Sequence, residues 1–212
     1  MTTETMRVHN ALAELKTLDD RIAKLIRSDK WVIHNKHSNT KIGGEEISAY
    51  LDAVKSRYQK VNDLIKRREA IKKAVIKSNA VTEINVGGET HTVAEAIEIK
   101  NNGVRLWQIL INRLTSDLES AKMMADRENE RLESRADDYI KSLTGNSDLK
   151  GMGDEVKRMR EDFIKAQTVE LVDPIKVYEE IERLSEKITV FLTEVDGALS
   201  VSNAITEITI EY

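Results

Sequence analysis

Hydrophobic residues recur at helical spacing over most of this chain. In residues 12–26 they lie three or four positions apart, which predicts an amphipathic helix that ends near Asp29. A second helix is predicted to begin after Gly43 and Gly44, where two glutamates favour a helix N-terminus. Its apolar residues alternate four and three positions apart, which predicts a narrow seam with a coiled-coil-like partner: Ile47, Leu51, Val54, Tyr58, Val61 and Ile65.

A third helix is predicted to begin at Thr92, because Thr92 and Glu95 have the spacing of a capping box. It is expected to continue to about Leu143, with an interruption at residues 101–103, which are two asparagines and a glycine. Beyond position 115 its large apolar residues become few. The segment 115–165 is therefore expected to project from the core or to pack thinly, with a flexible turn at 145–154.

The C-terminal part of the chain predicts two more helices. A short one is expected from Glu155 to about Thr168, and a long one with Asp173 as N-cap and Pro174 as first residue. The apolar seam of the long helix is also heptad-like: Val177, Ile181, Leu184, Ile188, Leu192, Val195 and Leu199.

A nine-letter segment occurs twice, as SNAVTEINV at 78–86 and as SNAITEITI at 202–210. In each copy we expect Ser-Asn to end a helix and the alternating residues that follow to form a half-buried strand, with Val81 on the buried face. Gly87 and Gly88 allow a tight turn after the first copy. The predicted fold is mainly α, with long antiparallel helices in a coiled-coil-like bundle, and one small β-sheet that contains both copies caps one end. The whole chain, 1–212, is expected to form a single helical domain.

Composition supports this fold and excludes several functions. The 212 residues include 33% charged and only 4% aromatic residues, one proline and no cysteine, which disfavours all-β and doubly wound folds. Without cysteine there is no disulfide framework, thiolate metal site or catalytic thiol. A net charge of −4 gives no general attraction to nucleic acid, and no long uninterrupted apolar run predicts a leader or a membrane span. A cytoplasmic location is expected. The basic residues 66–68, 72 and 73 are expected to form a solvated helix face.

Three stretches of the chain resemble the septicolysin-like family of small helical proteins of bacteria and their phages. They are the first helix ALAELKTLDDRIAKLI, the middle block from IKSNAVTEINV to QILINRL, and the end from VDPIKVYEE to SNAITEITI. The motif positions in the middle block are Asn79, Ala80, Thr82, Gly87, Thr92, Arg105 and Leu106. The resemblance implies a helical fold and a phage-type protein, and the family name suggests a cytolysin.

The loop of residues 30–41 is the first candidate ligand site. Trp31 offers a stacking surface, and His34, Lys36 and His37 offer donors for phosphate. The alternative is a solvated loop in which Trp31 covers the end of the bundle. His34 and His37 have no acidic or cysteine partner nearby in sequence, so no metal site and no cofactor are predicted.

The second candidate site combines two neighbouring segments. Thr90 and His91 precede a predicted helix N-terminus, where backbone N–H groups favour anions, and Arg105 and Trp107 follow the Asn-Asn-Gly interruption. The alternative is that Trp107 belongs to the core and Arg105 pairs with a carboxylate.

No nucleotide-binding loop, hydrolase triad or metalloprotease motif is present, so the chain is not expected to be an enzyme. The leading hypothesis is a homo-oligomeric binding protein that sequesters a small anionic, nucleotide-like signalling ligand. A structural or protein-interaction module without a ligand is the alternative, and cytolysin-like membrane activity is a third hypothesis.

Overall fold

The fold is mainly helical with small two-stranded sheets, as the sequence predicts. The computed structural model describes residues 2–28, 30–145 and 153–212. Residue contacts divide the chain into two compact units. Unit 1 comprises Met1–Asn101 and Val190–Tyr212, and unit 2 comprises Asn102–Thr189, so unit 2 is an insertion between the two parts of unit 1.

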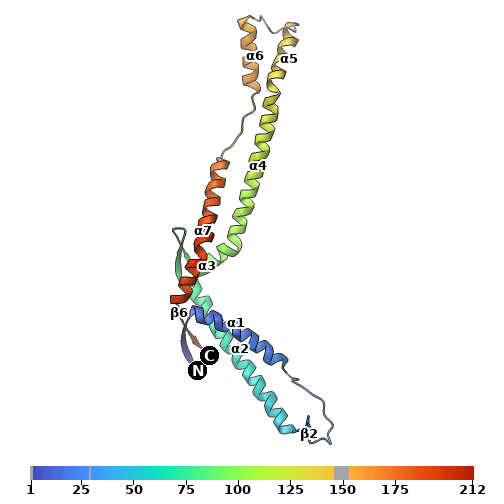
Figure 1. Cartoon of the computed structure of the whole chain (residues 1–212), viewed down its shortest axis with the longest axis vertical. Helices are drawn as coiled ribbons and strands as arrows, with labels where there is room; N and C mark the ends of the chain where they lie inside the picture. The colour runs from blue at the N-terminus through green and yellow to red at the C-terminus, as the bar shows by residue number, and fades with distance from the viewer. Residues whose placement is uncertain (1, 29, 146–152) are drawn as a thin grey trace. The chain divides into compact units, whose positions relative to one another are not determined.

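Unit 1 consists of a helical hairpin and three two-stranded sheets (Figure 1). Its elements are β1 (Thr3–Arg7), α1 (Val8–Arg27), β2 (Lys41–Ile42), β3 (Glu45–Glu46), α2 (Ile47–Val81), β4 (Glu83–Val86), β5 (Glu89–Thr92), α3 (Val93–Glu98), the last part of α7 (Val177–Ile205) and β6 (Glu207–Glu211). The two glutamates predicted for the first turn of the second helix instead form β3, and α2 begins one residue later.

The core of unit 1 lies between α1, α2 and β6. The amphipathic face of α1 packs against the C-terminal half of α2, and β6 adds two isoleucines on one face of its strand. The members of this core are at most 8% exposed: Val8, Ala11, Leu15, Leu18, Ile22, Ile71, Val75, Ile208 and Ile210. Because β-strand side chains alternate between faces, the residues on either side of each isoleucine of β6 remain exposed.

The two copies of the repeated segment leave their helices in the same way. The amide N–H groups of Thr82 and Thr206 donate to the carbonyl four residues earlier, at 2.9 Å in both copies. The carbonyl of Thr82 accepts the N–H of Val93 at 2.8 Å, and that of Thr206 accepts the N–H of Val8 at 2.9 Å. Each copy is therefore bonded to the residue that begins another helix, α3 for the first copy and α1 for the second.

The prediction that both copies lie in one sheet is wrong. β4 pairs with β5, and β6 pairs with β1. Gly87 and Gly88 have φ angles of +62° and +78°, as a two-residue hairpin turn between β4 and β5 requires. The partner of β6 comes from residues 3–7, a short alternating segment that the sequence interpretation had not treated as a strand.

The prediction that Val81 is buried is also wrong. Both helices continue two residues beyond Ser-Asn, so Val81 ends α2 and the equivalent Ile205 ends α7. Their side chains are 76% and 71% exposed. The buried positions of the first strand are Ile84 and Val86.

The described part of unit 2 consists mainly of helices. Its elements are a π-helical segment at its start (Ile99–Gly103, shared with unit 1), α4 (Val104–Glu130), α5 (Leu132–Thr144), α6 (Asp154–Gln167) and the first part of α7. The π-helix coincides with the predicted interruption at 101–103, and the predicted capping box at Thr92 is confirmed at the start of α3. Most of the predicted turn at 145–154 lies outside the described residues.

The last long helix starts later than predicted. It begins at Val177 rather than at Pro174, and Lys176 just before it has a positive φ of 55°. The carboxylate of Asp173 accepts the N–H of Val177 at 2.8 Å, so the aspartate serves the helix N-terminus from four residues away. Residues 168–176, which connect α6 to α7, are extended or in turns. This segment of unit 2 is therefore not helical.

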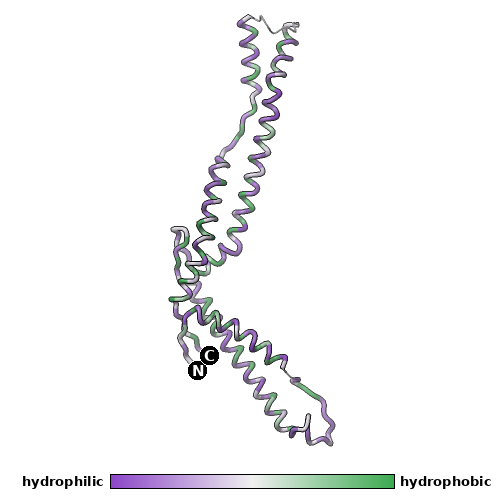
Figure 2. Tube along the Cα trace, in the orientation of Figure 1, coloured by the Kyte–Doolittle hydropathy of each residue, from purple (hydrophilic) through white to green (hydrophobic). Residues whose placement is uncertain are grey.

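Apolar and aromatic contacts join the helices of unit 2. Ile111 of α4 packs against Leu184 and Ile188 of α7, so these two seam residues of α7 are buried within one chain. Farther along, Tyr139 of α5 stacks on Phe163 of α6, with ring centroids 4.6 Å apart. Between these contacts α4 is largely polar, as the hydropathy colouring shows (Figure 2).

By length and composition alone, α7 is apolar enough to cross a membrane. A core helix of a folded protein satisfies the same test, and the residues on one side of α7 are less than 9% exposed: Leu184, Ile188, Phe191, Val195 and Ser202.

Candidate functional site

Trp31 is held in place by packing between the ends of α1 and α2. Its indole N–H donates to the carbonyl of Ile26 at 3.0 Å, and the guanidinium of Arg57 lies 4.3 Å from its ring centroid. The edge of Tyr58 contacts the same ring at a centroid distance of 6.4 Å. One face of the indole is therefore stacked on an arginine. The spacing of residues in the sequence does not predict that Arg57 is the partner of Trp31.

The other candidates in this loop are exposed. The side chains of His34, Lys36 and His37 all face solvent, and a turn is closed by the N–H of Asn39, which donates to the carbonyl of Lys36 at 3.0 Å. Within the described residues no group of three or more His, Asp or Glu side chains could hold a metal ion. The loop thus supplies accessible donors, and its aromatic ring is engaged by the protein.

His91 contributes to packing in unit 1. On β5, its ring contacts that of Phe191 edge to face at 6.2 Å, and its Nε2 lies 3.7 Å from the carboxylate of Glu89. The neighbouring Thr90 is exposed. The helix that follows, α3, spans only Val93–Glu98.

Arg105 and Trp107 belong to α4 in unit 2. Trp107 packs against the core formed by α4 and α7, and the ammonium of Lys187 lies 5.3 Å from its ring centroid. Arg105 is exposed. The second predicted site therefore draws two residues from each unit, and the structure describes the two pairs separately.

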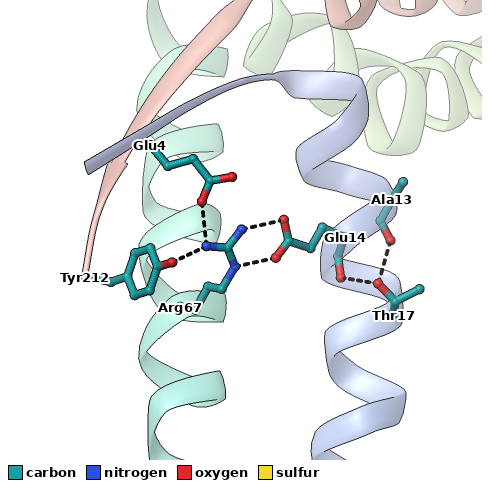
Figure 3. A network of polar contacts seen from close by, with 6 residues as sticks. All are labelled: Glu4, Ala13, Glu14, Thr17, Arg67 and Tyr212. Carbon is teal, nitrogen blue, oxygen red and sulfur yellow. Dashed lines mark hydrogen bonds and ion pairs between the residues drawn. The ribbon is translucent and has the colours of Figure 1, made fainter. Parts of the chain in front are cut away.

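A polar cluster missed by the sequence interpretation centres on Arg67 (Figure 3). Its guanidinium donates to the carboxylate of Glu14 at 2.5 and 3.0 Å and to that of Glu4 at 2.7 Å. It also donates to the hydroxyl of Tyr212, over whose ring it lies at 5.0 Å. The expectation of a solvated basic face is wrong for Arg67, whose side chain is only 18% exposed.

This cluster shifts the pKa values of Glu4 and Arg67. The hydrogen bond from Arg67 is the main cause that lowers the pKa of the Glu4 carboxyl, and hydrogen bonds to Glu14 and Glu4 raise the pKa of Arg67. The bonds join β1, α1, α2 and the residue after β6. Glu4, Glu14 and Tyr212 accept the hydrogen bonds that the Arg67 guanidinium donates. The cluster is therefore suited to holding unit 1 together rather than to binding an external anion.

The grooves of unit 1 lie beside its strands. Two grooves of about 450 and 670 Å³ follow α2 and β6, with Ala74, Lys77 and Thr209 common to both. A third, of about 360 Å³, lies beside β4 and the end of α7. All three are lined by residues other than the eight candidates from the sequence.

Comparison with known proteins gives no relative. No protein-family model, curated protein or solved structure matches this chain. The resemblance to the septicolysin-like family therefore stays a prediction.

Proposed function

We propose that this protein is a non-enzymatic helical scaffold that works as a homo-oligomer, in which a second copy covers helix faces that one chain leaves open. The support comes from α4. Its inner side packs on α7, while Leu106, Ile109 and Leu110 on another side are 58%, 55% and 45% exposed. Contiguous apolar surface of this kind is uncommon on monomers, because exposing it to water costs about 25 cal/mol per Å².

Exposed seam residues on α2 add to this support. Leu51 and Tyr58 are 48% and 63% exposed, although the heptad-like spacing of the helix would place them at an interface. Leu184 and Ile188, from the seam of α7, are buried within unit 2. The proposed contacts between chains therefore depend on other helix faces.

Light scattering at micromolar concentration tests the proposal. We expect a mass of at least two chains of 24.1 kDa each. A Leu106→Lys, Leu110→Lys double variant should reduce that mass, whereas Asn112→Lys, on an exposed polar position of the same helix, should preserve it. A mass of one chain for the wild type at every concentration would contradict the proposal.

A second candidate function is the binding of a small nucleotide-like anion in the cytoplasm, at the loop of residues 30–41. The observation that favours it is the exposure of His34, Lys36 and His37, whose donors remain accessible to a phosphate. Calorimetric titration with cyclic and linear nucleotides tests it. Binding should weaken about tenfold in Lys36→Ala, since a charge-assisted contact contributes about 1.5–3 kcal/mol, and the absence of heat with every nucleotide would exclude this candidate.

A further inference from the structure

The C-terminal half of α4 carries an exposed face with an unusual arrangement of charge. Six residues form it and line a shallow groove of about 480 Å³: Glu119, Lys122, Met123, Asp126, Arg127 and Glu130. Met123 is 62% exposed at the centre of this face. In the part of the chain that the structure describes, none of the five charged side chains takes part in an ion pair.

These charges are complementary to themselves when two copies of the helix run antiparallel. If α4 of a second copy crosses this face with a two-fold axis between Met123 and Met124, residues whose numbers add up to about 247 lie opposite each other. Glu119 then faces Arg127 of the second copy, and Lys122 faces Asp126. By symmetry each of these contacts occurs twice, and the Met123 side chains of the two copies lie next to the axis, close to each other.

The alternative orientation is unfavourable. In a parallel pair in register, each charged residue faces its own equivalent, so like charges meet at every one of the five positions. The exposed apolar residues near the start of α4 lack this self-complementary pattern, because there Arg113 is already paired with Asp117 at 2.9 Å. The charge pattern therefore favours a second copy of this helix in the antiparallel direction over one in the parallel direction.

We propose that a second copy of this chain docks antiparallel on the Met123 face of α4, with Glu119–Arg127 and Lys122–Asp126 contacts between the chains. The proposal rests on the proposed self-association and names one of its surfaces. Met123 supplies the apolar centre, and its flexible thioether side chain adapts to a neighbour of the same kind. The surrounding charges form the rim that fixes the register.

A charge swap tests the contact without changing the composition of the chain. Glu119→Arg alone places two arginines opposite each other, and Arg127→Glu alone places two glutamates opposite each other. Each should weaken the dimer at least tenfold, measured by sedimentation as a dissociation constant. The double variant, Glu119→Arg with Arg127→Glu, should restore binding to within about threefold of the wild type.

Rescue by the double variant would be specific for contact between chains. The two positions are eight residues apart, about 12 Å along one helix, so they cannot compensate for each other within a chain. Glu161→Arg on α6, an exposed residue with the same change of charge, is the matched control and should leave the dissociation constant unchanged.

Disulfide trapping gives an independent measurement, because the chain contains no cysteine. Met123→Cys should form a covalent dimer under mild oxidation, and Lys165→Cys on α6 should not. If the wild type self-associates but neither the charge reversals nor Met123→Cys has an effect, this surface is wrong and the proposed scaffold function stands. A monomeric wild type would overturn both.

Discussion

Replacing Arg67 with methionine should destabilise unit 1 by about 2 kcal/mol. Methionine keeps most of the aliphatic length of the side chain and removes all donors of the guanidinium. The side chains of Arg67 and Glu14 are 18% and 29% exposed, so the pair is neither fully buried nor freely solvated. Exposed ion pairs contribute about 0–1 kcal/mol, and loss of one partner of a buried pair costs about 3–5 kcal/mol, which brackets the expected value.

Thermal unfolding followed by circular dichroism measures this effect. For a chain of this length, about 2 kcal/mol corresponds to a fall in Tm of about 4–8 °C. The loss of stability should shrink only partly in high salt, because the bidentate contact with Glu14 is partly shielded from solvent.

The neighbouring Arg68 provides the matched control. Among the described residues its ion pair is with Asp19, and the two side chains are 38% and 53% exposed, so Arg68→Met should lower Tm much less. Equal losses in the two variants would refute the reasoning, because they would show that burial and the number of partners do not decide the stability contributed by these arginines.

Three further predictions concern unit 1. Ile84→Asp should cost several kcal/mol because it buries an unpaired carboxylate, while Val81→Asp should leave Tm nearly unchanged; the reverse order would restore the buried position first expected for Val81. Thr92→Ala should cost about 1 kcal/mol in urea unfolding because it removes the cap of α3, whereas Thr92→Ser should retain most of the stability. The pKa values of Glu4 and Glu95 are lowered by hydrogen bonds from Arg67 and from the Thr92 backbone. The stability that these two carboxylates contribute should be fully present above their ordinary pKa of 4.5 and should be lost as the pH falls through the lowered values. A Tm that stays constant between pH 6 and 2 would contradict this.

Local features of the fold could be predicted from the sequence. The helix periodicity, the capping box at Thr92 and the Gly87–Gly88 turn all depend on residues within a few positions of each other, and each of these elements is found. The residues 101–103 interrupt the helix because two asparagines and a glycine support regular helical bonding poorly, and the backbone widens to a π-helix there.

The remaining features depend on contacts between distant segments. Arg67 looked like one member of a solvated basic face, and its partners Glu4 and Tyr212 lie 63 and 145 residues away. The same limit applies to Trp31, since nothing in its loop shows that Arg57 would stack on it. The pairing of β6 with β1 could not be inferred either, because repeated sequence letters indicate equivalent strands without naming the partner of each.

The insertion of unit 2 within unit 1 sets an order for folding during synthesis. Thr5 and Thr209, which hydrogen bond across β1 and β6, are 204 residues apart, so synthesis must pass residue 209 before this sheet can close. Until then the nascent α1–α2 hairpin lacks Ile208 and Ile210, two of its core residues, and carries an open apolar side. Unit 2 is continuous in sequence and meets no such delay. Bringing β1 and β6 together closes a long loop, and the entropy that this costs is offset only when β6 pairs. The inserted unit is thus expected to fold on the ribosome before the unit that surrounds it, with the first-made helices as the natural substrate for chaperones in the interval.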